Sequence, residues 1–279
     1  MNNPPANGFS TQGLSDPTYG PRTLLSMVRT TATLLVFALS LILLVDHSIA
    51  TDLPDPVKIV LVGDSTVSEY PEKVTTRGWG QYLEQGFKQG TVDVINLAAS
   101  GRSTKTFITE GRWTKALATE PTYVFIQFGH NDSHAPERPE ATNPATDYKQ
   151  FLRRYIEESR EIEAVPVLVT PMVRRAFDAE GKIIENLTPL NRPLSEYAKA
   201  MLEIAKEMDV PVIDLQTSSK ELAEKIGPDE SKQMASKPGD ITHFNAKGAE
   251  AIANLVIADI EETVPALASY LKQRKAATE

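Results

Sequence analysis

Short apolar runs alternate with longer segments of helical spacing from Pro56 onward. The runs are rich in Val and Ile, and five of them predict strands: Lys58–Val62, Val92–Ala98, Tyr123–Gly129, Val165–Thr170 and Val210–Leu215. Their apolar residues are continuous and do not alternate with polar ones, which is typical of strands buried on both faces of a sheet.

Between these runs, apolar residues recur every three or four positions, which is the spacing of one helix face. The clearest cases lie in the segments Tyr148–Tyr155, Leu194–Ala205 and Ala251–Ile260. Strands that alternate with helices predict a parallel sheet covered on both sides. We therefore predict an α/β fold, a three-layer α/β/α sandwich with a five-stranded parallel sheet. Residues 51–279 should form one domain, since no repeat or linker divides them.

The N-terminal segment differs from the rest of the chain. Residues 1–21 are rich in Asn, Pro, Gly, Ser and Thr, which is typical of disorder. Arg22 and Arg29 then precede 16 uncharged residues, Thr30–Val45. With Ser48-Ile49-Ala50 as a cleavage site, this pattern predicts a signal peptide over residues 1–50. The alternative is an uncleaved signal anchor. Only in that case would the protein stay at a membrane. Either way we expect a secreted or periplasmic protein of bacterial type.

Composition narrows the class of protein. The chain has 279 residues, of which 41% are hydrophobic and 24% charged, as in globular proteins with a sizeable core. The absence of cysteine excludes disulfides, thiolate nucleophiles and cysteine-bound metals. The net charge of −8 argues against binding to nucleic acid. The sequence shows no metal-ligand cluster and no nucleotide-binding motif, so we predict no metal and no cofactor, and nothing implies a protein partner.

Four polar clusters stand where parallel strands would bring them together. They are Gly63-Asp64-Ser65-Thr66, Ala99–Ser103, Gly129-His130-Asn131-Asp132 and Asp240–Phe244. Three of them directly follow predicted strands, and ligands bind at the carboxyl ends of the strands in such sheets. The clusters therefore predict a site at this edge of the sheet.

The clusters contain a complete set of groups for acyl transfer. Ser65 can act as the nucleophile, His243 as its general base, and Asp240 can fix the tautomer of His243. The main-chain N–H groups of Ser65 and Gly101 and the side-chain amide of Asn131 can stabilise a tetrahedral oxyanion. Gly101 would let the chain approach closely, because it has no Cβ.

In this order, the four clusters resemble the four sequence blocks of the SGNH (GDSL-like) hydrolase superfamily. Gly-Asp-Ser-Thr, Gly101-Arg102-Ser103, Phe128–Asp132 and Thr242-His243-Phe244 resemble its rhamnogalacturonan acetylesterase branch. The resemblance implies a flavodoxin-like fold and the removal of acetyl groups from a pectic polysaccharide without a metal. A lipase or small-ester hydrolase of the same superfamily and a non-catalytic sugar-binding module are the alternatives.

Several nearby residues have two interpretations. Asp132 could replace Asp240 as the orienting acid, although it does not precede the base. His130 could line the pocket or form a structural hydrogen bond. Asp64 is expected to hold the turn by accepting main-chain N–H bonds. His134 is expected in a surface loop.

The remaining candidates would contact the substrate. Trp79 could be a sugar platform or could pack against the sheet. Arg77, Arg102, Arg174 and Arg175 could bind the carboxylates of an anionic polysaccharide in bidentate fashion, or could pair with surface acids.

Overall fold

The computed structural model describes residues 55–187 and 192–273, which belong to one compact unit, Pro54–Glu279. The predicted signal peptide therefore lies outside the described residues. The strands are β1 (Val57–Gly63), β2 (Val92–Asn96), β3 (Tyr123–Gln127), β4 (Val165–Val169) and β5 (Val212–Ile213).

The five strands form one parallel sheet in the order β2-β1-β3-β4-β5. This is the flavodoxin-like order, so the predicted fold class is confirmed. Two strand predictions need correction. The fifth strand is only Val212–Ile213, because α6 already begins at Leu215. The second strand is not buried on both faces: it lies at the sheet edge, and its Asp93 is exposed.

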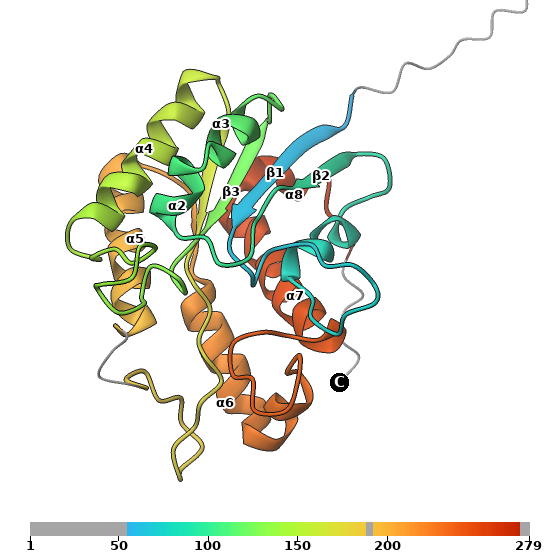
Figure 1. Cartoon of the computed structure of the whole chain (residues 1–279). Helices are drawn as coiled ribbons and strands as arrows, with labels where there is room; N and C mark the ends of the chain where they lie inside the picture. The colour runs from blue at the N-terminus through green and yellow to red at the C-terminus, as the bar shows by residue number, and fades with distance from the viewer. Residues whose placement is uncertain (1–54, 188–191, 274–279) are drawn as a thin grey trace, which may run out of the picture. The chain divides into compact units, whose positions relative to one another are not determined.

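Helices cover both faces of the sheet (Figure 1). One face packs against α2 (Thr104–Thr109), α3 (Arg112–Leu117), α4 (Asp147–Glu161) and α5 (Leu194–Met208). The other packs against α6 (Leu215–Gln233), α7 (Ala246–Thr263), α8 (Pro265–Ala268) and the 3-10 helices η1 (Trp79–Gln81) and η2 (Leu83–Gly86). Alternate residues of β1 enter the two cores, Ile59 and Leu61 one and Val60 and Val62 the other.

The three amphipathic segments are confirmed as α4, α5 and α7. The short helices α2, α3 and α8 escaped prediction because four to six residues are too few to show a period. Helix α6 is interrupted by Gly227, with φ of 77°, and by Pro228. Among the residues that the structure describes, no helix is long and apolar enough to cross a membrane.

Candidate active site

The turn after β1 carries Ser65 and is held by its neighbour Asp64. Oδ1 of Asp64 accepts hydrogen bonds from the main-chain N–H of Thr66 at 2.9 Å and from its hydroxyl at 2.7 Å. A Cβ at Gly63 would lie only 2.7 Å from the carbonyl oxygen of Gln127, so the turn requires glycine at this position. The bonds agree with the turn-holding role expected of Asp64.

A chain of buried polar groups continues from this turn into the core. The Thr66 hydroxyl accepts from Nε2 of Gln127 at 2.9 Å, and Oε1 of Gln127 accepts from Nε1 of Trp79 at 2.7 Å. Trp79 is only 1% exposed. The prediction of a sugar platform is therefore wrong for Trp79, because its ring packs in the core and its N–H is already bonded.

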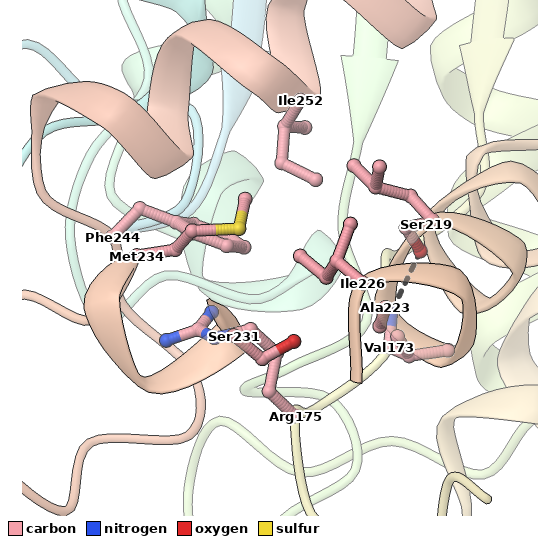
Figure 2. Close-up of a pocket in the computed structure, with 10 residues that line it drawn as sticks. Val173, Arg175, Ser219, Ala223, Ile226, Ser231, Met234, Phe244 and Ile252 are labelled. Atoms are coloured by element: carbon pink, nitrogen blue, oxygen red, sulfur yellow. Dashed lines mark hydrogen bonds between the residues drawn. The ribbon is translucent and has the colours of Figure 1, made fainter. Parts of the chain in front are cut away.

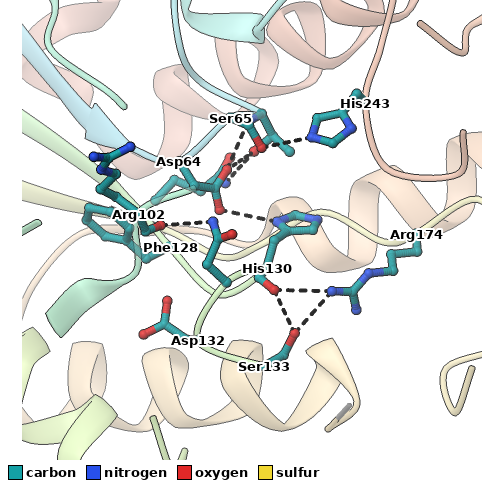
Figure 3. A network of polar contacts seen from close by, with 12 residues as sticks. Asp64, Ser65, Arg102, Phe128, His130, Asp132, Ser133, Arg174 and His243 are labelled. Atoms are coloured by element: carbon teal, nitrogen blue, oxygen red, sulfur yellow. Dashed lines mark hydrogen bonds and ion pairs between the residues drawn. The ribbon is translucent and has the colours of Figure 1, made fainter. Parts of the chain in front are cut away.

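His130 lies beside Asp64 in the same network (Figure 3). Its Nδ1 is 3.5 Å from Oδ2 of Asp64, and neither ring nitrogen has a hydrogen-bond partner among the described residues. Burial lowers the pKa of His130 more than Asp64 raises it, so the imidazole is neutral at neutral pH. His130 is 4% exposed, so its ring offers almost no surface to a substrate, and its 3.5 Å approach to Asp64 is a polar contact and not the expected hydrogen bond.

The structure brings Ser65, His243 and Asp240 together from opposite ends of the chain. The Ser65 hydroxyl is 3.0 Å from Nε2 of His243 (Figure 3), and Nδ1 of His243 is 3.0 Å from Oδ2 of Asp240. A carboxylate at Nδ1 places the ring proton there and leaves Nε2 to accept a proton from the hydroxyl. This arrangement has the geometry of a nucleophile, a base and an orienting acid.

Asp240 is kept ionised by donors around it. Burial alone would raise its pKa, but the main-chain N–H groups of His243 and Thr242 and the hydroxyl of Ser236 lower it to about 2 overall. The corresponding distances to the carboxylate are 2.8, 2.9 and 2.9 Å. A carboxylate with this pKa remains negatively charged throughout the neutral range.

Arg175 holds the main chain that carries Asp240 and His243. Its Nη2 donates to the carbonyls of Asp240 at 3.0 Å and His243 at 2.9 Å, and Nη1 to that of Thr242 at 3.4 Å. The guanidinium also lies 4.1 Å from the ring centroid of Phe244. Arg175 is buried. The predicted substrate contact is wrong for Arg175, because its N–H groups are bonded to this loop and its side chain is enclosed.

A narrow apolar cavity lies against Arg175, between α6 and α7 (Figure 2). Val173, Ala223, Met234, Phe244 and Ile252 contribute to its walls. Its volume is about 10 Å³, enough for about one water molecule.

Asp132 is fully buried on the other side of the network. It accepts from both the main-chain N–H and the hydroxyl of Thr104, and from the hydroxyl of Thr142 at 2.9 Å. Burial raises the pKa of Asp132 to about 7, against the effect of these bonds. Its bonds go to threonines, whereas His243 is bonded to Asp240, so the geometry does not support Asp132 as the orienting acid.

The three predicted oxyanion donors come from the ends of three strands. Nδ2 of Asn131 donates to the carbonyl of Arg102 at 3.0 Å, which fixes the amide and leaves its second N–H. The N–H groups of Ser65 and Gly101 donate to no residue that the structure describes. Gly101 has φ of +81°, and a Cβ there would meet nothing within 4 Å. Glycine is therefore required for the left-handed backbone and not, as predicted, for close approach.

The other candidate contacts differ in what their donors bind. Arg77 donates to several carbonyls of its own loop, including that of Val74 at 2.5 Å, which corrects the predicted carboxylate contact. Arg102 bonds Glu110 at 3.0 Å and the carbonyl of Ser100, and remains partly exposed. Arg174 is half-buried beside His130 (Figure 3).

Sequence reasoning missed two residues of the site. The Tyr70 hydroxyl donates to the carbonyl of Ser65 at 2.9 Å, and burial raises the pKa of this phenol. Gln127 supports the nucleophile turn, although its strand context suggested only a buried apolar run. The only sequence signal for Gln127 was that it is a polar residue inside this apolar run. Tyr70 had none. His134, expected at the surface, is partly exposed and bonds Glu140 at 2.6 Å.

A family model described as GDSL-like lipase/acylhydrolase matches residues 61–251, which contain all four clusters. The chain belongs to this family. Rhamnogalacturonan acetylesterase RhgT of Bacillus subtilis is 41% identical over 236 residues, which are 79% of this chain and 96% of that protein. YesY of the same organism, named a probable rhamnogalacturonan acetylesterase, is 37% identical over 222 residues, 77% of this chain and 98% of that protein.

Solved structures share the fold. An acetylxylan esterase of Geobacillus stearothermophilus superposes with a TM-score of 0.58 at 17% identity, over 78% of this chain and 97% of that one.

The SGNH resemblance and its rhamnogalacturonan acetylesterase-like branch are confirmed by the family model and the two Bacillus subtilis relatives, and the protein is a carboxylic ester hydrolase. The sugar-binding module without catalysis is excluded. Residues 55–187 and 192–273 contain no cluster of side chains suited to a metal ion.

Proposed function

We propose that the protein is an exported esterase that removes O-acetyl groups from a pectic polysaccharide of the rhamnogalacturonan type. The chemistry is supported by one observation above all, the continuous line of hydrogen bonds from the Ser65 hydroxyl through His243 to Asp240. The substrate is supported by the names of the two Bacillus subtilis relatives. Export is supported by the apolar segment Thr30–Val45 behind Arg22 and Arg29.

The reaction runs through an acetyl-enzyme. Oγ of Ser65 attacks the acetyl carbonyl carbon, and its proton passes to Nε2 of His243. The negative charge on the carbonyl oxygen is stabilised by the N–H groups of Ser65, Gly101 and Asn131. When the carbon–oxygen bond to the sugar breaks, the sugar hydroxyl takes the proton from His243. Water then attacks acetyl-Ser65 by the same route, and acetate leaves as Ser65 regains its proton.

The lipase alternative needs a place for a long acyl chain. The names of the two Bacillus subtilis relatives, both acetylesterases, instead favour a short acyl group. The test compares acetate release from acetylated rhamnogalacturonan, acetylated xylan and p-nitrophenyl acetate with hydrolysis of p-nitrophenyl octanoate. We expect rhamnogalacturonan to be the best polysaccharide and acetate to exceed octanoate. Faster hydrolysis of octanoate would establish the lipase alternative.

Export has a separate test. The full chain is expressed in a bacterium, and the cell fractions and medium are assayed for the protein. We expect it outside the cytoplasm, with a mature N-terminus at Thr51. Activity that stays in the cytoplasmic fraction with an intact N-terminus would contradict export without affecting the esterase assignment.

A further inference from the structure

Arg174 and Arg175 follow β4 as neighbours, but their donors are used in different ways. Arg175 bonds carbonyls through both terminal nitrogens. Arg174 uses only Nη2, which donates to the carbonyl of His130 at 3.2 Å and to the hydroxyl of Ser133 at 3.1 Å. A guanidinium has five N–H groups. Those on Nε and Nη1 of Arg174 have no partner among the described residues, and neither nitrogen is buried.

Among the residues that the structure describes, no carboxylate forms an ion pair with Arg174. None of its hydrogen bonds reaches a carboxylate, whereas Arg102 is paired with Glu110. Burial lowers the pKa of Arg174 more than the distant charge of Asp64 raises it. A half-buried cation is poorly hydrated, so an incoming anion gains more from it than from an exposed arginine.

Arg174 lies close to the groups that carry out the reaction. It bonds the carbonyl of His130, which directly precedes the oxyanion donor Asn131 (Figure 3). The ring of His130 lies 3.5 Å from the carboxylate of Asp64, which directly precedes Ser65. The two bonds from Nη2 also fix the direction of the guanidinium before any ligand arrives.

We propose that Arg174 binds a carboxylate of the polysaccharide, that of a uronic acid unit near the sugar whose acetyl group reaches Ser65. This inference rests on the proposed function and names the group by which the site selects an anionic chain. A guanidinium already held at Nη2 can donate from its free Nη1 or Nε to a carboxylate oxygen, while its charge attracts the anion. The negative net charge of the protein makes such a local cation necessary for holding an anionic polymer.

The test varies the charge on both enzyme and substrate. Acetylated rhamnogalacturonan oligosaccharides are compared with the same material after methyl esterification of the carboxyl groups. We expect wild-type protein to prefer the charged form, and Arg174→Gln to lower this preference about 10- to 100-fold, mainly through KM. Arg174→Lys should fall between them, because it keeps the charge and loses the N–H groups on Nε and Nη1. Arg154→Gln on α4, an exposed arginine paired with Glu158, removes the same charge and should keep the wild-type preference.

A binding measurement checks the inference without deacetylation. Deacetylated oligosaccharide should inhibit hydrolysis of p-nitrophenyl acetate competitively, with a Ki about 10- to 100-fold higher for Arg174→Gln. An unchanged charge preference, or an equal loss on charged and esterified substrates, would overturn the subsite and leave the esterase proposal standing. Wild-type protein that cleaves p-nitrophenyl acetate but neither oligosaccharide would instead overturn the proposed substrate, and the subsite with it.

Discussion

The two halves of the site are secured in different ways. The nucleophile half, Gly63–Thr66, continues a central strand and rests on the buried polar chain that ends at Trp79. The base half, Ser236–Phe244, is a loop held by main-chain bonds, such as that from the N–H of Arg77 to the carbonyl of Phe244 at 2.8 Å, and by the guanidinium of Arg175. The first half therefore depends on the stability of the core, whereas the second depends on bonds to a loop, several of which come from one guanidinium.

Replacing the nucleophile should have the largest effect. We expect Ser65→Ala to reduce kcat on p-nitrophenyl acetate by a factor on the order of 10⁶. The fold should be retained, because the Ser65 hydroxyl bonds only the His243 ring. Steady-state kinetics and thermal unfolding measure the two effects. Substantial residual activity in Ser65→Ala would assign the nucleophile to another residue.

The orienting acid comes next. Asp240→Asn should lower kcat by about 10⁴-fold, because the amide can hold the wrong tautomer of His243. Asp132→Asn is the matched control: it places an amide against the donors of Thr104 and Thr142, so it should reduce stability much more than kcat per folded molecule. The reverse order of kcat losses would make Asp132 the orienting acid.

A third pair of variants removes one anchor from each half of the site. Arg175→Met removes the donors to the base loop, and a shift of about 1 Å there should lower kcat by about 10²-fold with little change in KM. Arg175→Lys should recover part of kcat. Gln127→Leu leaves the Trp79 N–H unpaired and should cost about 1–3 kcal/mol of stability, with a much smaller loss of kcat.

Urea unfolding and kinetics on the same preparations separate these outcomes. If Gln127→Leu lost as much kcat as Arg175→Met at equal folded fraction, both halves would depend on the core in the same way, and the contrast between them would disappear.

The smallest effect is a pH dependence of stability. The pKa of Asp132 is about 7 in the folded protein, because burial raises it, against about 3.9 for an unfolded chain. The folded state then binds more protons between these values, so the free energy of unfolding should fall as pH rises from about 4 to about 7. Asp132→Asn should lack this slope.

Asp240 in the base half should contribute little to this slope. Asp240 has a lowered pKa of about 2, so its stabilising contribution is present above about pH 4 and is lost only as pH falls towards 2. Urea unfolding between pH 4 and 8 measures both. A slope that persists in Asp132→Asn would assign it to another group.

Local patterns predicted the sheet well. The Val- and Ile-rich runs located all five strands. The polar residues behind them include Ser65 and Asn131, and the cluster before the last helix includes Asp240 and His243, which the structure brings together with Ser65. The end of β5 could not be located from the sequence, because its apolar residues continue into those of the following helix, which begins at Leu215. Arg174 and Arg175 were indistinguishable in sequence, because their roles depend on which carbonyls lie next to each, and those belong to segments far away in the chain.

The hold of Arg175 on main-chain carbonyls has a consequence for protein engineering. Carbonyl oxygens are the same in every residue, so this anchor is indifferent to the side chains of the loop it fixes. Lys237 and Ile241 in that loop face an open cleft of about 880 Å³. Libraries at these two positions should yield folded and active variants at high frequency, which makes the loop a natural place to redirect the enzyme towards other acetylated glycans.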